Sequence, residues 1–432
     1  MNTDRNVIIK DKALIVGIQY KDGRERDDEY FVRSHMAELK SLCETMGLAA
    51  SAEALVKLRA PQSRYLIGTG RAEELIALAG EQDCSLIVFD EDLSPSQQRN
   101  WEELSGLCVI DRQEVILEIF ASRAKTREAV LQVALARLEY SLPRLTRAWT
   151  HLSRQRGGAR GTKGEGETQL ESDRRIIVRK IAAVKQELET VKRYRAVQRK
   201  QRQTVPVPVV SLVGYTNAGK SSLLNSLTGA EVLVEDKLFA TLDPTTRRIK
   251  FQSGTEFLLS DTVGFIRKLP HTLIESFNST LEEVLKAELL LHVLDASNPD
   301  FANQYATTRM VLEQIGAGEK PALTVFNKTD LLQDPLDSLF IRKRFPEALF
   351  VSAINGQGLT ELVDAVDSIL LGSRRLVRLS IPQDRWDLVA LLHRQAQILE
   401  ETCVDSIISI QARLADREMH KFYPYIVQEE HA

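Results

Sequence analysis

The sequence predicts an α/β protein built from four consecutive parts. Strand and helix patterns alternate in the first and third parts, which favours open and mostly parallel sheets. Two heptad stripes separate these parts and predict a projecting antiparallel two-helix coiled coil. A shorter strand–helix–strand pattern after the third part predicts a small α+β domain. The expected boundaries enclose residues 1–120, 121–204, 205–372 and 373–432.

Composition excludes several classes of protein. Apolar residues make up 43% and charged residues 27% of the 432 residues, values typical of globular domains. No apolar run approaches the ~18 residues of a membrane-spanning helix, and Met1–Lys12 lacks the apolar stretch of a signal peptide. The 4 cysteines have no metal-ligand spacing, which is typical of a reduced cytosolic protein. We expect a cytoplasmic monomer, with peripheral association with a membrane as the alternative location.

The first part alternates between the two periodicities. We expect strands at 13–19, 65–67, 85–89 and 107–110, and helices at 30–46, after 70 and at 95–104. Gly68-Thr69-Gly70 opens one helix, where an anion could meet the helix N-terminus. Because the third glycine of the dinucleotide fingerprint is absent, a plain turn is the favoured interpretation.

The second part is a basic helical hairpin. Its stripes are spaced 4-3-4-3 and consist of Leu131, Leu135, Leu138, Leu142, Leu145 and Trp149, then Ile177, Ile181, Val184, Leu188 and Val191. Pro143 should bend the first helix. The second helix, about 171–203, would reach roughly 50 Å at 1.5 Å per residue.

Glycines and cations gather at the expected hairpin tip. Residues 121–204 carry 21 Lys and Arg against 8 Asp and Glu, a net charge of +13. The stretch between the helices holds 5 glycines within ten residues and the cations Arg154, Arg156, Arg160 and Lys163. Such a segment resembles those that become ordered on RNA. A flexible linker is the alternative, and a solvated helical surface is the plain interpretation of the charge.

The third part opens with a phosphate-binding loop. Gly214-Tyr215-Thr216-Asn217-Ala218-Gly219-Lys220-Ser221 satisfies G-x-x-x-x-G-K-[ST] between an expected strand at 209–213 and a helix. Successive backbone N–H groups of such a loop point at phosphates. Lys220 would contact the β and γ phosphates, and the Ser221 hydroxyl would ligate Mg²⁺. This motif alone indicates a nucleoside triphosphate.

Three further motifs specify guanine. Asp261-Thr262-Val263-Gly264 follows an apolar strand, so Asp261 can hold a magnesium-bound water and the Gly264 N–H can sense a γ-phosphate. Asn327-Lys328-Thr329-Asp330 follows another strand, and its last carboxylate can accept the N1–H and amine of guanine. Adenine would leave that carboxylate unpaired, which is costly in a closed site. Ser352-Ala353-Ile354 can offer a backbone N–H to the guanine oxygen.

A fifth segment should report whether the γ-phosphate is present. It runs Phe239-Ala240-Thr241-Leu242-Asp243 and continues through Pro244 to Thr246. A switch threonine reaches Mg²⁺ only with the triphosphate bound. Thr241, Thr245 and Thr246 all compete for that role, and spacing does not separate them. The expected GTP site therefore comprises Gly214–Ser221, Phe239–Asp243, Asp261–Gly264, Asn327–Asp330 and Ser352–Ile354.

The chain resembles the HflX family of translation-factor-related GTPases over nearly its whole length. Besides the generic motifs, the resemblance rests on Leu66–Gly70, Leu93–Asn100, Asp111-Arg112 with Ile119–Ala121, Gly164–Glu171 with Asp173–Arg175, and Phe239–Pro244. It implies that Thr241 is the switch I magnesium ligand. It also implies catalytic roles for Lys220, Thr241, Asp261 and Gly264 with Mg²⁺ as the cofactor.

The resemblance further implies a partner. Family members bind the large ribosomal subunit and its rRNA, with the glycine-rich tip pointing toward the peptidyl transferase region, and they split or rescue stalled ribosomes under stress. The alternative is an RNA-remodelling or subunit-assembly factor with an additional ATP site in the N-terminal domain, as reported for some members. No second full phosphate-binding motif is present in the sequence.

Two positions depart from common GTPases. Phe265 stands where many carry a water-orienting glutamine, and an apolar ring cannot orient water. Slow intrinsic hydrolysis follows, with core packing as the plain role of the ring. Asn217 resembles the loop asparagine that coordinates K⁺ in some GTPases lacking that glutamine, and simple loop tolerance is the alternative.

Overall fold

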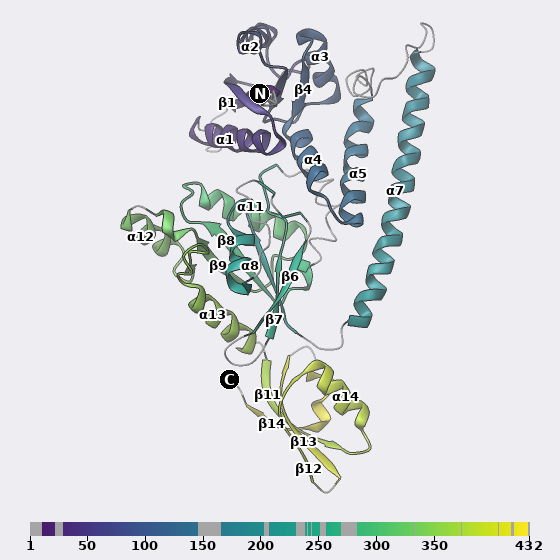
Figure 1. Cartoon of the computed structure of the whole chain (residues 1–432), viewed down its shortest axis with the longest axis vertical. Coiled ribbons are helices and arrows are strands. Elements are labelled where there is room, and N and C mark those ends of the chain that lie inside the picture. Colours follow the sequence, from purple (N-terminus) through teal and green to yellow (C-terminus); the bar gives the residue numbers. More distant parts are fainter. Residues whose placement is uncertain are drawn as a thin grey trace, which may run out of the picture. The chain divides into compact units, whose positions relative to one another are not determined.

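The computed structural model describes residues 11–21, 29–145, 166–202, 207–229, 238–239, 241–242, 244–250, 256–268, 283–332, 334–372, 374–404, 406–415 and 419–430. Three sheets carry the fold (Figure 1). The chain divides into two compact units. Among the described residues, the first unit holds those up to Thr190 together with 238–239, 241–242 and Lys268, and the second holds the others.

The N-terminal sheet confirms the open parallel arrangement. Its order is β2-β1-β3-β4 and every neighbouring pair is parallel. The strands are β1 (Lys12–Tyr20), β2 (Ala49–Leu58), β3 (Leu86–Phe89) and β4 (Cys108–Asp111). The helices are α1 (Glu29–Met46), α2 (Thr69–Glu81), α3 (Pro95–Ser105) and α4 (Arg112–Arg123). A capping box of Ser94 and Gln97 starts α3, and left-handed Gly106 ends it.

Two details of this sheet differ from the expectation. The strand expected at 65–67 is wrong, since Leu66 instead makes an isolated antiparallel bridge with Gln62. The strand β2 was not expected, because Ala49–Leu58 carries small and charged residues and lies at the edge of the sheet. Apolar periodicity is weak in such an edge strand, since only part of it is buried.

The helical part contains α5 (Arg127–Ser141) and α7 (Gly166–Arg202), drawn alongside each other in Figure 1. Ion pairs Arg127–Glu187 and Lys185–Glu139 join them. Pro143 does not bend the first helix as expected: α5 ends at Ser141, and Leu142–Arg144 form a 3₁₀ turn (η2). Proline removes a helical N–H and clashes with the preceding turn, so the helix stops before it. No helix within the described ranges has the length and apolar character needed to cross a bilayer.

The second sheet positions the nucleotide motifs. Its order is β10-β9-β8-β5-β7-β6, and only the β6–β7 pair is antiparallel. The strands are β5 (Val209–Gly214), β6 (Thr245–Lys250), β7 (Glu256–Asp261), β8 (Leu289–Asp295), β9 (Ala322–Asn327) and β10 (Leu349–Phe350). The helices are α8 (Lys220–Thr228), α11 (Phe301–Gln314), α12 (Pro335–Arg344) and α13 (Leu359–Gly372), with η3 at Thr329–Leu331.

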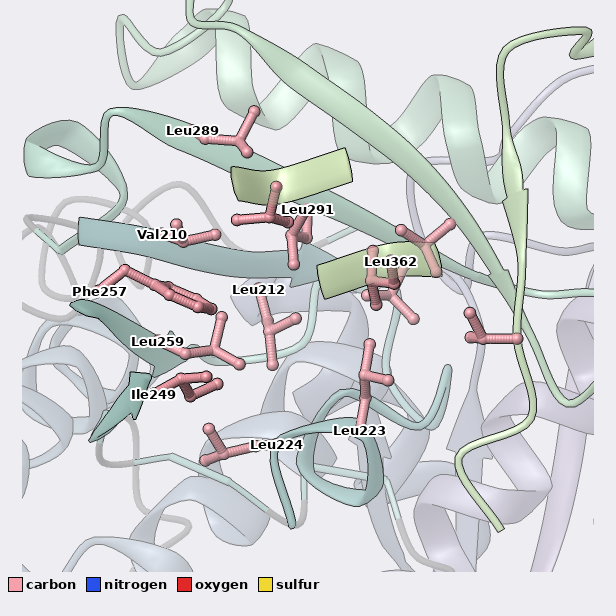
Figure 2. Packing of buried hydrophobic residues seen from close by; sticks show 14 of the residues in the cluster. Val210, Leu212, Leu223, Leu224, Ile249, Phe257, Leu259, Leu289, Leu291 and Leu362 are labelled. Atoms are coloured by element: carbon pink, nitrogen blue, oxygen red, sulfur yellow. The ribbon is translucent and has the colours of Figure 1, made fainter. Parts of the chain in front are cut away.

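The core of this domain lies against its central strands. Figure 2 shows Leu212, Leu259 and Leu291, which come from the adjacent strands β5, β7 and β8, packed with Leu223 and Leu224 of α8. Strands buried on both faces are mostly apolar, and β8 is buried from Leu289 to Leu294, with His292 as the polar residue in that run. The polar motif residues therefore sit at strand ends.

The C-terminal domain is α+β, as expected. Its antiparallel sheet has the order β12-β13-β11-β14. The elements are β11 (Arg374–Pro382), α14 (Trp386–Gln395), β12 (Gln397–Val404), β13 (Ile407–Ala415), η4 (Tyr423–Tyr425) and β14 (Ile426–Glu430). Strands β12 and β14 were not expected from the sequence. Their side chains are largely exposed or polar, so they carry little apolar signal.

Candidate nucleotide-binding site

The phosphate-binding loop runs from the end of β5 at Gly214 to the start of α8 at Lys220. Gly219 has φ +85°, a left-handed conformation that favours glycine. A Cβ atom there would lie 2.1 Å from Nδ2 of Asn327. Glycine is thus required both by the backbone and by the close approach of the guanine motif.

Lys220 is a buried cation held by the loop itself. Its Nζ donates hydrogen bonds to the carbonyl oxygens of Tyr215 at 2.7 Å and Gly214 at 3.2 Å. Burial lowers the pKa of Lys220 to about 8; nearby Asp261 opposes this shift and Lys328 adds to it. A buried ammonium with a lowered pKa gains from an anionic neighbour. A phosphate at this loop would supply that charge.

The two residues expected near Mg²⁺ lie together. The Ser221 hydroxyl donates to Oδ2 of Asp261 at 2.6 Å. A hydroxyl and a carboxylate are the oxygen donors that Mg²⁺ prefers. The donor set therefore fits a magnesium ion bound by Ser221, with Asp261 holding one of its waters.

Switch II begins directly against the loop. A Cβ atom on Gly264 would lie 2.8 Å from Cα of Thr216 and 3.0 Å from Nζ of Lys220, so only glycine fits. Phe265 is 1% exposed, which confirms that its ring packs in the core. Its N–H donates to the Gly214 carbonyl at 3.0 Å, and its carbonyl accepts from the Thr216 N–H at 2.8 Å.

The guanine motif joins three segments. Asn327 Nδ2 donates to the carbonyl oxygen of Ala218 at 3.1 Å, and its Oδ1 accepts from the Ala353 N–H at 3.0 Å. The Ser352 hydroxyl donates to the Asp330 carboxylate. Asp330 itself is exposed in the middle of η3, which follows β9. Its second oxygen is therefore accessible to a base, while Asn327 fixes the loops on either side.

Lys328 completes the guanine segment with an ion pair that the motif alone does not indicate. Its Nζ lies 2.7 Å from Oδ2 of Asp295, the last residue of β8. Asp295 ends β8, the parallel strand beside β9. This position was the feature of the sequence that could have indicated a role for Asp295. Ile354 is 78% exposed, so its side chain is not held within the site.

Switch I is described only in part. Phe239, Thr241 and Leu242 belong to the first unit, whereas the loop, Asp261 and the guanine motif belong to the second. Phe239 packs on Phe120, with ring centroids 4.6 Å apart. Ala240 and Asp243 lie outside the described residues, as do Arg154, Arg156, Arg160 and Lys163.

The competing threonines lie in a strand. Thr245 begins β6 and pairs in register with Asp261, and the Thr246 hydroxyl shares a hydrogen bond with Ser260 at 2.8 Å. Thr241 lies outside any strand or helix. A switch residue must move, so this placement favours Thr241, in agreement with the resemblance.

A second polar cluster lies in the N-terminal domain. We call Asp90, Asp111, Arg112 and Glu114 the Arg112 cluster. Arg112 is fully buried and pairs with Asp90 at 2.8 Å and with Glu38. Asp111 accepts hydrogen bonds from the Leu93 N–H at 3.1 Å and the Tyr140 hydroxyl at 2.9 Å. Burial and then the Asp111 charge raise the pKa of Glu114 to about 7.

Comparisons with known proteins cover most of the chain. Family models described as GTP-binding GTPase N-terminal, GTP-binding GTPase middle region and 50S ribosome-binding GTPase match residues 33–121, 123–202 and 209–328. A GTP-binding protein from Sulfolobus solfataricus, solved with GDP, is 24% identical over 84% of this chain and 98% of that one, with a TM-score of 0.44.

Curated relatives are closer in sequence. GTPase HflX of Akkermansia muciniphila is 44% identical over 415 residues, 94% of each chain. GTPase HflX of Escherichia coli K12 is 40% identical over 408 residues, covering 94% of this chain and 93% of its own. With the phosphate-binding loop, Asp261–Gly264 and the guanine motif brought together in one domain and this similarity along its length, the chain belongs to the HflX family of GTPases, which hydrolyse GTP.

Proposed function

We propose that this GTPase binds the large ribosomal subunit and uses GTP-dependent binding to split or rescue stalled ribosomes under stress. The proposal rests on the contacts among Lys220, Gly264 and the loop. Gly264 lies directly against Lys220, and the Lys220 ammonium donates to the Tyr215 carbonyl of the loop. Such a network changes when a γ-phosphate arrives. A family model described as a 50S ribosome-binding GTPase matches this domain, which supports the choice of partner.

Each residue has a distinct task in this proposal. Lys220 leaves the Tyr215 carbonyl and turns its ammonium to the β and γ phosphates. Ser221 and Thr241 bind Mg²⁺, which neutralises phosphate charge when present. The Gly264 N–H senses the γ-phosphate, and Asp330 selects guanine. Thr241→Ala should then spare GDP binding and blunt the response to GTP.

Hydrolysis without a partner should be slow. Phe265 is buried and has no group that could orient water. Asn217 is exposed in the loop and has φ +59°, and it resembles the loop asparagine that coordinates K⁺ in some GTPases lacking the glutamine. We propose K⁺ as that ion. Replacing K⁺ with Na⁺ at constant ionic strength should lower turnover, and equal rates in both salts would remove K⁺ from the proposal.

The helical hairpin supplies the RNA contact. The exposed cations of α7 include Arg174, Arg175, Arg179, Lys180, Lys185 and Arg193. Cations on one long helix attract a polyanion and give affinity that falls steeply with salt. The tip residues Arg154, Arg156, Arg160 and Lys163 extend this charge, and we propose that they contact rRNA.

Light scattering of intact ribosomes tests the function. We expect the signal to fall with protein and GTP and to stay level with GDP. A variant whose tip is shortened to a two-glycine turn should bind nucleotide normally and leave the ribosomes intact. Splitting at the normal rate by the shortened protein would show that the tip is only a linker. Activity with ATP in place of GTP would favour the RNA-remodelling alternative with an N-terminal ATP site.

A further inference from the structure

Tyr215, the second residue of the phosphate-binding loop, makes a contact that the loop motif does not require. The motif leaves its side chain free to vary, yet this side chain is 5% exposed. Its hydroxyl accepts a hydrogen bond from the backbone N–H of Arg267 at 2.9 Å. Arg267 lies three residues beyond Gly264, in switch II. The hydroxyl thus joins the loop to the switch through a side chain.

Backbone contacts place this hydrogen bond at the end of a short ladder. Tyr215 and Phe265 form an isolated parallel bridge. The Phe265 N–H and carbonyl bond to Gly214 and Thr216 on either side of Tyr215. Three residues before Phe265, the Thr262 hydroxyl donates to the Leu212 carbonyl at 2.6 Å. The switch therefore follows β5 and the loop from Thr262 to Arg267.

Gly264 lies between the two ends of this ladder. Its backbone fits against Thr216 and Lys220 so closely that no Cβ atom can be added. The Tyr215 carbonyl holds the Lys220 ammonium at 2.7 Å, while the Tyr215 hydroxyl holds Arg267. One residue thus contacts both the cation that meets the phosphates and the segment that senses them.

We propose that Tyr215 is a positioning residue for GTP hydrolysis, which holds switch II so that Gly264 remains beside Lys220. The hydroxyl touches no phosphate and acts through Arg267. Without it, the residues after Gly264 have one anchor fewer, so the γ-phosphate meets a less ordered switch. Base and diphosphate contacts do not involve the hydroxyl, so GDP binding is unaffected.

The test is Tyr215→Phe in the full chain, assayed without ribosomes, so that its result is independent of the proposed ribosome function. Removing one hydrogen bond to a backbone N–H should lower kcat about 2- to 10-fold. Kd for GDP should stay unchanged, while KM for GTP should rise as the affinity for a non-hydrolysable GTP analogue falls. The ratio of affinities for a non-hydrolysable GTP analogue and GDP should fall with kcat.

Tyr305→Phe is the matched control. Tyr305 lies in the same domain and its ring stacks on His292, with centroids 4.7 Å apart, an interaction that phenylalanine retains. This variant should keep the parental kcat. An unchanged or higher kcat for Tyr215→Phe would overturn the proposal. A parallel loss of GDP affinity would also overturn it, because the hydroxyl would then support the loop as a whole.

Discussion

The nucleotide site and the Arg112 cluster occupy equivalent places in two different parallel sheets. In each, polar or charged residues lie at the carboxyl ends of neighbouring strands: Asp295 and Asn327 end β8 and β9, while Asp90 follows β3 and Asp111 ends β4. This edge is where open α/β sheets bind ligands. Position in the sheet alone would therefore predict a ligand-binding site at both places.

The two places differ in how their charges are balanced. Among the described residues, Lys220 donates to two backbone carbonyls and has a lowered pKa, and Asp330 stays exposed. Arg112 faces two carboxylates, and Asp111 receives several donors. A site that awaits a charged ligand leaves charge for that ligand to balance, whereas in the cluster Asp90 pairs with Arg112 and Lys268, and Asp111 pairs with Arg144. Four substitutions test this distinction.

Arg112→Met should have the largest effect, and it should be on stability. It removes the buried cation that pairs with Asp90 and Glu38, and removing one partner of a buried ion pair typically costs about 3–5 kcal/mol. Urea unfolding followed by circular dichroism would measure the loss. Arg137→Met is the control, because the Arg137–Glu118 pair is exposed and worth about 0–1 kcal/mol. Equal stability of both variants would contradict a structural role for the cluster.

Lys220→Ala should have the next largest effect, and it should be on turnover. Removing the cation that stabilises the transferring phosphate should lower kcat about 100- to 1,000-fold, with the unfolding midpoint unchanged or higher because a buried charge is gone. Steady-state phosphate release measures it. Lys250→Ala removes an exposed lysine that pairs with Glu256 and should keep the parental rate. Unfolding of the Lys220 variant at a much lower midpoint would place this lysine with the structural residues.

Asp330→Asn should change the choice of base. The amide would present a donor to the guanine donors, and one unpaired buried polar group costs about 1–3 kcal/mol. We expect preference for GTP over XTP to fall about 10- to 100-fold in competition binding. Asp337→Asn changes an exposed acid on α12 and should leave the preference intact. If Asp330→Asn also left it intact, the guanine assignment would fail.

Glu114→Gln should have the smallest effect, confined to a pH window. The pKa of this acid is raised from 4.5 to about 7 in the folded protein, so folding favours the protonated form. Its stabilisation is present below pH 4.5 and is lost as the pH rises to about 7. The slope for one group is at most about 1.4 kcal/mol per pH unit. Urea unfolding between these limits should show a smaller pH slope in the variant, and identical slopes would refute the shift.

The nucleotide site was predictable from sequence because its chemistry requires fixed residues at short spacing. Gly219 and Lys220 follow from the loop motif, and in the structure they lie between β5 and the start of α8. The Arg112 cluster has no such spacing: Arg112 pairs with residues 22 and 74 positions away. Only the fold brings these partners together. The hydrogen bond of the Tyr215 hydroxyl could not be predicted from sequence either, since its donor is a backbone N–H 52 positions away.

The fold itself was predictable where burial is strong. Strand β5 is mostly apolar and buried, and it was expected nearly to the residue. Strand β2 was missed, since an edge strand needs little apolar surface. The end of α5 before Pro143 shows the opposite problem. There the leucine stripe continues past the proline, but the helix ends because proline has no backbone N–H to donate.

The burial of Phe265 has a consequence for how the cell's nucleotide supply acts on this protein. If hydrolysis waits for a partner and nucleotide exchange is faster than unaided hydrolysis, an idle molecule exchanges nucleotide many times for each GTP it consumes. Its loaded fraction then approaches equilibrium with the surrounding GTP and GDP. The resting population would report the ratio of the two nucleotides, and starvation that lowers GTP would unload the protein before any ribosome is met.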